Sequence, residues 1–106
     1  MKSSIMKETC GTSVRLSVLG ELVGTGNTLA ADIAEAVADP GVTEVIVDLE
    51  AVTFLDSGGI HILVTGEHSA ARTGVAYAIV NPRDHVLRVL TCAGILPPVD
   101  TDRIDS

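Results

Sequence analysis

The tetrapeptide Asp56-Ser57-Gly58-Gly59 is the segment of this 106-residue chain whose side chains could most readily do chemistry. A serine hydroxyl can attack an electrophile or accept a phosphoryl group, and glycines allow the backbone to turn sharply. Ser57 directly precedes a segment of helical periodicity, where serine is a favoured N-cap residue. A helix start also presents unpaired N–H groups that stabilise an anion. We therefore consider three roles for Ser57: a structural cap, a phosphate acceptor and a nucleophile.

The nucleophile is the weakest of these interpretations. The same tetrapeptide surrounds the reactive serine of chymotrypsin-like proteases, but 106 residues cannot form their two barrels. The Gly-x-Ser-x-Gly elbow of α/β-hydrolases is absent, and no oxyanion site is indicated. The candidate bases His61, His68 and His85 all lie downstream. We expect no catalytic residue, and hence no enzyme.

Metal and nucleotide sites are also not indicated. His61 and His68 share a helix face but lie two turns apart, about 10 Å along the axis, which is too far for one ion. The glycines between Gly20 and Gly26 are not followed by the Gly-Lys-Ser/Thr of a P-loop. We expect no metal and no cofactor.

The serine segment must be held by the elements around it. Residues 5–9 and the alternating residues 14–19 predict a strand hairpin closed by Gly20. After a glycine-rich loop, Asn27 or Thr28 is expected to cap a helix that ends at Pro40-Gly41. Its expected inward residues are Ala30, Ile33, Ala34 and Val37.

The remaining elements alternate strand and helix. Residues 44–49 are typical of a strand covered on both faces, and residues 75–80 predict a further strand. Between them a helix is expected, with Ser57 as its N-cap and Gly74 as its end. A last helix is expected to start at Asn81-Pro82 and end at Gly94. In the helix expected to start at Ser57, the inward residues are Ile60, Leu63, Val64 and Ala71. In the last helix they are Val86, Leu87, Leu90 and Ala93.

This ββαβαβα order predicts a single α/β domain with helices packed on a mostly parallel, mixed sheet of four to five strands. The fifth strand would be a short one near Ile95-Leu96. The domain is expected to occupy residues 1–106, with a core from about 5 to 99 and a flexible acidic tail at 100–106.

Composition narrows the functional classes. The net charge is −7 and the only aromatic residues are Phe54 and Tyr77, so nucleic-acid binding is disfavoured. No apolar run reaches the roughly 20 residues that span a bilayer, and the N-terminus lacks the apolar run of a signal peptide. Cys10 and Cys92 match no metal or redox spacing and are expected to be free thiols in or near the core. We expect a cytoplasmic protein without membrane insertion.

Taken together, the motifs resemble the STAS domain, and more narrowly the bacterial anti-sigma factor antagonists. The resemblance covers residues 5–99 and rests on four segments in order: Gly20-Glu21-Leu22, Val47-Asp48-Leu49-x-x-Val52-x-Phe54-x-Asp56-Ser57-x-Gly59, Asn81-Pro82, and Val89-Leu90-x-x-x-Gly94-Ile95.

The resemblance implies a partner switch. Members of the family bind an anti-sigma factor, often a serine kinase, and thereby free a sigma factor. The kinase phosphorylates the serine after the motif's aspartate, here Ser57, which releases the antagonist, and a phosphatase restores it. The implied partner-binding residues are Asp56, Ser57, Gly58, Gly59, Glu21, Thr25 and Asn27.

Two positions depart from the family pattern. Gly58 stands where many members carry a second serine, and Val23 stands where aspartate commonly follows Gly-Glu-Leu. An alternative within the same fold is a constitutive scaffold subunit of a lipid-transport or stress-signalling complex.

Overall fold

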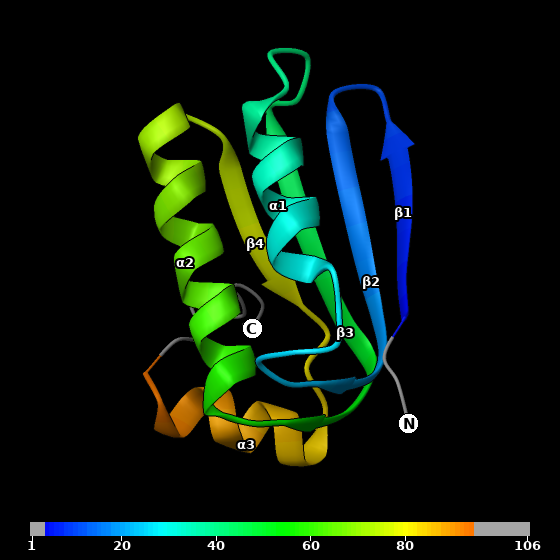
Figure 1. The fold of residues 1–106 in the computed structure, drawn as a ribbon, viewed down its shortest axis with the longest axis vertical. Helices are drawn as coiled ribbons and strands as arrows, with labels where there is room; N and C mark the ends of the chain where they lie inside the picture. Colours follow the sequence, from blue (N-terminus) through cyan, green and yellow to red (C-terminus); the bar gives the residue numbers. More distant parts are fainter. Residues whose placement is uncertain (1–3, 95–106) are drawn as a thin grey trace, which may run out of the picture.

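The computed structural model describes residues 4–94, which form a four-stranded sheet of order β1-β2-β3-β4 and three helices (Figure 1). The first two strands are antiparallel, whereas β2, β3 and β4 are parallel. The expected α/β class, the element order and the mostly parallel mixed sheet are confirmed. The proposed strand at 95–96 and the tail at 100–106 lie outside the described residues. The elements are β1 (Ser4–Cys10), β2 (Ser13–Leu22), α1 (Leu29–Ala38), β3 (Glu44–Leu55), α2 (Ser57–Thr73), β4 (Ala76–Val80) and α3 (Asp84–Cys92).

Helices α1 and α2 lie side by side on one face of the sheet (Figure 1). Alternate residues of the two central strands point toward them and are fully or almost fully buried: Val14, Leu16 and Val18 from β2, and Val45, Val47 and Leu49 from β3. Period-two alternation places these residues on one face of the sheet, and their burial is the main stabilising contribution. Tyr77 of β4 joins this layer to α2, because its hydroxyl donates to the carbonyl oxygen of Leu63 at 3.0 Å. Burial, and then the negative charge of Glu67, raise the pKa of this phenol.

The buried faces of the helices differ partly from expectation. In α1 the core residues are Leu29, Ile33, Ala36 and Val37, and the expected Ala30 and Ala34 are exposed. The reason is volume: the spacing i, i+4, i+8 buries Leu29, Ile33 and Val37, which removes more apolar area from water than the alanine stripe would.

The other two helices also differ partly from expectation. Helix α2 buries Leu63 as expected, together with Gly59, Ile62, Gly66 and Ala70, whereas Ala71 is exposed and Ile60 and Val64 are only half-buried. Small residues at 59, 66 and 70 allow α2 to approach its neighbours closely. In α3 Val86 and Leu90 are buried, but Leu87 and Ala93 are exposed.

Both central strands are longer than expected. Gly20 does not close β2, which continues to Leu22, and β3 continues to Leu55. Gly20 has a φ of +95° and adjoins two register shifts between β2 and β3. A glycine in this conformation permits a bulge, which bends the strand without ending it. The consequence is that Leu22 and Leu55 are paired, so the segments that follow them start side by side.

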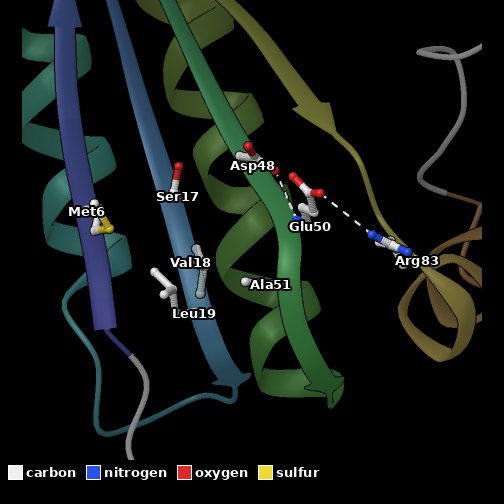
Figure 2. A pocket seen from close by; sticks show the side chains of 8 residues that line it. All are labelled: Met6, Ser17, Val18, Leu19, Asp48, Glu50, Ala51 and Arg83. Atoms are coloured by element: carbon white, nitrogen blue, oxygen red, sulfur yellow. Dashed lines mark hydrogen bonds and ion pairs between the residues drawn. The ribbon is translucent and has the colours of Figure 1, made fainter.

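The face of β3 opposite α1 and α2 is only partly covered, with Ile46 half-buried and Glu50 exposed, which corrects the expectation of a strand covered on both faces. Figure 2 shows this face with both helices behind the sheet. Asp48 is nevertheless buried there, at 8% exposure, because polar side chains surround it. Its carboxylate accepts from Arg15 Nη2 at 2.6 Å, from Asn81 Nδ2 at 3.2 Å and from the backbone N–H of Glu50 at 2.9 Å.

Asn81 is therefore not the start of α3. It has a φ of +59° and bonds Asp48, and the helix begins at Asp84 after Arg83 as the N-cap residue. Asparagine tolerates left-handed backbone better than most residues, and here its amide fixes the β4–α3 connection to β3. Arg83 also forms an exposed ion pair with Glu50 at 3.6 Å (Figure 2).

The Asp48 cluster predicts an acid-sensitive contribution to stability. Burial alone would raise the pKa of Asp48, but the hydrogen bonds from Glu50 N–H, Arg15 and Asn81 outweigh it and hold the pKa below its usual value. Since the folded pKa is lowered, the ionised carboxylate stabilises the fold above the unfolded pKa of about 3.9, and this contribution is lost as the pH falls through the folded value. Asp48→Asn should lower the free energy of unfolding by about 2 kcal/mol at pH 7.

Urea denaturation of both proteins from pH 7 to pH 3 measures this effect. The gap between wild type and Asp48→Asn should narrow below about pH 4 as Asp48 is protonated. The control is Glu50→Gln, which breaks only the exposed pair with Arg83 and should change stability by less than about 1 kcal/mol. If the difference in free energy of unfolding stays constant down to pH 3, the charge of Asp48 is not the source of the stabilisation.

The two cysteines are free, as expected, but both are exposed and not in the core. Cys10 is the last residue of the edge strand β1 and Cys92 the last of α3, so neither side chain meets the layer between the sheet and the two long helices. Within residues 4–94 no helix is both long and apolar enough to cross a membrane.

Candidate functional site

The candidate site lies at the end of the sheet where the three parallel strands finish (Figure 1). Parallel strands place their carboxyl ends at one edge, and the connections that follow them meet there. Three segments gather at this edge: the β2–α1 loop (residues 23–28), the serine turn (Asp56–Gly59) and the start of α3.

The N-cap residue of α2 is Asp56 and not Ser57. Asp56 has extended backbone, and its Oδ1 accepts from the backbone N–H of Gly59 at 2.8 Å. Its carbonyl accepts from Ile60 N–H at 3.0 Å, which begins the helical hydrogen bonding. The expectation that Ser57 caps the helix is wrong, because aspartate one residue earlier satisfies the same donors.

Ser57 is consequently the first residue of α2, and its side chain is exposed. Its hydroxyl has no hydrogen-bond partner among the described residues. The nearest histidine in sequence, His61, lies one turn along α2 with its Nε2 3.5 Å from Thr65 Oγ1. What the geometry provides is an accessible hydroxyl beside the carboxylate of Asp56 at a helix N-terminus.

Removing the cap should weaken the serine turn measurably. Asp56→Ala deletes the acceptor for Gly59 N–H and should lower stability by about 1 kcal/mol, or a few degrees in Tm. Thermal unfolding followed by circular dichroism measures the change. Asp56→Asn is the matched control, because asparagine caps about as well as aspartate. If the asparagine variant melts as low as the alanine variant, the cap is not what Asp56 contributes.

The β2–α1 loop is closed on itself by Asn27. Its Oδ1 accepts from Leu29 N–H at 3.0 Å and its Nδ2 donates to the carbonyl of Val23 at 2.8 Å. Thr28 occupies the N-cap position of α1 but makes no capping bond, and its hydroxyl donates to Asp32 instead. Of the two expected caps, Asn27 therefore bonds the helix start. Thr25 is exposed at the tip of this loop.

Contacts between glycines bring the loop and the serine turn together. A Cβ built on Gly58 would lie 2.6 Å from Gly24 Cα, and one on Gly59 would lie 2.3 Å from the carbonyl oxygen of Leu22. The Asp56 N–H also donates to that carbonyl at 3.4 Å. Of the candidate residues, Asp56, Ser57, Gly58 and Gly59 form one turn, and Asn27 lies in the loop packed on it. Glu21 is exposed at the end of β2 and pairs with Phe54 of β3.

A contact between two aromatic rings near the site was not expected from the sequence. Phe54 is 42% exposed, and its ring stacks on that of His85 with centroids 5.6 Å apart and planes 13° apart. The pair borders the start of α3, where a shallow hollow of about 280 Å³ is lined by Val52, Thr53, Arg83 and others. Gly24 was also missed. Phe54 falls in the quoted motif, but nothing in the sequence indicates its contact with His85.

No group of three or more potential metal-ligating side chains occurs within residues 4–94. The second hollow, of about 410 Å³, lies on the open face of the sheet between Met6, Leu19, Ala51 and Arg83 (Figure 2). It is separate from the serine turn.

Comparison with known proteins agrees with this geometry. A sequence model of the STAS domain matches residues 9–103. An anti-sigma factor antagonist from Mycobacterium paratuberculosis has a similar structure, with a TM-score of 0.77, 24% identity, and coverage of 89% of this chain and 80% of that one. The Bacillus cell fate determinant SpoIIAA in its phosphorylated form gives a TM-score of 0.68 at 20% identity, covering 95% and 99%.

An anion transporter also contains a similar fold. The murine anion transporter Slc26a9 matches 88% of this chain with a TM-score of 0.64 at 16% identity, but only 18% of the transporter is covered. Comparison with curated proteins returned no match. At these identities the solved structures support the fold.

Proposed function

The chain belongs to the STAS-domain family, and we propose that it is an anti-sigma factor antagonist switched by phosphorylation of Ser57. The observation that carries the proposal is the exposed hydroxyl of Ser57, which no described residue engages, at a helix start capped by its neighbour Asp56. A kinase can reach such a hydroxyl without unfolding anything. The similarity to the Mycobacterium antagonist and to phosphorylated SpoIIAA supports it.

In the proposed cycle the unphosphorylated chain binds an anti-sigma factor that is itself a serine kinase, and a sigma factor is freed. The kinase then transfers the γ-phosphoryl group of ATP to Ser57 Oγ, the hydroxyl proton is lost, and ADP leaves. The phosphoserine carries about −1.5 to −2 charges beside the carboxylate of Asp56. A partner surface would have to desolvate this dianion, so the complex dissociates until a phosphatase hydrolyses the ester.

The proposed contact surface uses the expected residues in two ways. Ser57, Glu21 and Thr25 are exposed and can touch the partner directly. Asp56, Asn27, Gly58 and Gly59 hold the turn and the loop in place. We propose no metal, no cofactor, no catalytic residue, no direct nucleic-acid contact and no membrane insertion, and we place the protein in the cytoplasm, where ATP and a kinase would meet it.

The same family contains a second candidate function. The similarity to the STAS portion of an anion transporter favours a constitutive scaffold, such as a subunit of a lipid-transport or stress-signalling complex. In that case the loop and the serine turn would still bind a partner, but phosphorylation would not control the binding.

Affinity capture of the intact chain from its native cells, with and without ATP, separates the two functions. Mass spectrometry identifies the proteins that remain bound in each condition. The switch is supported if a kinase-type anti-sigma factor is recovered and ATP releases it. Recovery of a transporter or a stress-signalling assembly that ATP leaves bound would favour the scaffold.

A further inference from the structure

Gly58 occupies a position where glycine is costly. It is the second residue of α2, and glycine inside a helix is less stable than alanine by roughly 1 kcal/mol. Neither Gly24 nor Gly58 is among the residues with positive φ, so the backbone conformation would accept a side chain at both places. The reason for glycine must lie in what surrounds these two residues.

The nearest surroundings of each glycine are backbone atoms of the other, and a Cβ on Gly58 would also lie 3.3 Å from Asp56 Oδ1. A Cβ on Gly58 would lie 2.6 Å from Gly24 Cα and 2.7 Å from Gly24 N, and a Cβ on Gly24 would lie 3.2 Å from Gly58 Cα. These are backbone atoms, which cannot turn aside as a flexible side chain would. The backbone of the β2–α1 loop thus rests directly on the backbone of the serine turn.

We propose that the facing pair Gly24–Gly58 is a specificity determinant: it fixes the β2–α1 loop against the serine turn in the arrangement that the partner kinase recognises. The inference rests on the proposed function and names the feature by which that site is recognised. Gly58 is a positioning residue, because it acts by setting the position of the loop and not by contacting the partner.

A side chain at 58 must displace the loop. Moving Gly24 from 2.6 Å to an ordinary contact of about 3.4 Å requires a shift of about 0.8 Å. Asn27 anchors both ends of the loop, at Val23 and at Leu29, so the shift falls on the residues between them. Thr25 at the loop tip therefore moves relative to Ser57, and a partner fitted to both would meet them in a changed arrangement.

The first experiment uses the free protein and no partner. Amide chemical shifts and hydrogen exchange of residues 23–27 are compared in wild type, Gly24→Ala, Gly58→Ala and the double variant. The control is Gly41→Ala in the α1–β3 connection, where an added Cβ meets only Asp39 Oδ1 at 3.4 Å. Gly58→Ala should perturb the loop most, Gly24→Ala less, and Gly41→Ala not at all. In the double variant the perturbations should be less than additive, because a loop already displaced accommodates the second methyl group.

The second experiment measures phosphorylation of Ser57 by the kinase captured with the wild-type chain. Since misplacement by about 1 Å at a reacting site can cost up to about 100-fold, we expect kcat/KM for Gly58→Ala and Gly58→Ser to fall at least tenfold. Gly41→Ala should match wild type. If Gly58→Ala folds poorly, the phosphorylation of Gly24→Ala, in which the added Cβ makes a milder clash, tests the inference instead.

The outcomes separate this inference from the proposed function. Unperturbed loop amides in Gly58→Ala, or perturbed amides with unchanged phosphorylation, overturn the glycine pair as a specificity determinant and leave the switch standing. If no kinase phosphorylates the wild-type chain, the proposed function fails and the selectivity claim fails with it. The amide data still decide whether the two backbones are coupled.

Discussion

Replacing Ser57 with alanine should abolish phosphate incorporation by the partner kinase and should leave the unphosphorylated complex intact. The reason is that Gly58 and Gly59 carry no hydroxyl, so the serine turn offers a single acceptor. Because the Ser57 side chain is exposed and bonds no described residue, its loss should change stability by no more than about 0.5 kcal/mol. Intact-mass spectrometry after incubation with kinase and ATP measures the incorporation.

The matched control is Thr9→Val, which removes an exposed hydroxyl on β1 beside Val14, at the end of the sheet away from the serine turn, and should leave incorporation at Ser57 unchanged. Ser57→Asp should weaken kinase binding only in part, because one carboxylate supplies less charge and fewer acceptor oxygens than a phosphate. The switch is refuted if Ser57→Ala still takes up phosphate, or if Ser57→Ala and Ser57→Asp bind the partner equally well.

Much of the fold could be predicted because the hydrophobic periodicity of the segments agrees with the residues that end them. Alternation in 14–19, the β-branched run in 44–49 and Gly74 each indicate their element, and the structure contains all of them. The buried faces of the helices were harder to predict. Ala30, Ala71 and Ala93 have the right spacing for a buried stripe, but burial is decided by the volume of the neighbours, and larger residues such as Leu29 and Ile62 occupy the core instead.

The sequence predicts that the serine turn precedes a helix, but it does not predict the internal geometry of the turn. The motif located the serine turn, yet both Asp56 and Ser57 are good caps, and only the three-dimensional path of the chain shows that Asp56 bonds Gly59. The contact of Gly24 with Gly58 joins residues 34 positions apart, and no local pattern reports it. The same holds for Asp48, whose partners Arg15 and Asn81 each lie 33 residues away.

The net charge of −7 affects how a partner would approach this edge of the sheet. An acidic domain attracts a basic partner surface over distances of about a Debye length, roughly 8 Å at physiological salt. Adding a phosphate would increase that long-range attraction. In the proposed switch, release after phosphorylation would therefore come from the cost of desolvating the dianion beside Asp56 within the contact itself.

Gly59→Ala should be the most destabilising single substitution in the serine turn. A Cβ at this buried position would lie 2.3 Å from the carbonyl oxygen of Leu22 and 2.7 Å from Leu55 Cδ1. The carbonyl belongs to the end of β2, so relief requires the strand or the helix start to move. Overpacking of this kind costs up to about 3 kcal/mol, and we expect a loss near that value in urea denaturation.

Gly74→Ala distinguishes steric crowding from backbone strain as the cause. Gly74 has a φ of +76°, but an added Cβ there would meet only open space, so alanine should cost only about 1 kcal/mol. If both variants lose the same free energy, the close approach of Gly59 to Leu22 is not what matters. If Gly59→Ala loses two to three times as much, the end of β2 and the start of α2 are in rigid contact. That contact requires glycine at 59, close to the one residue of the turn that carries a hydroxyl.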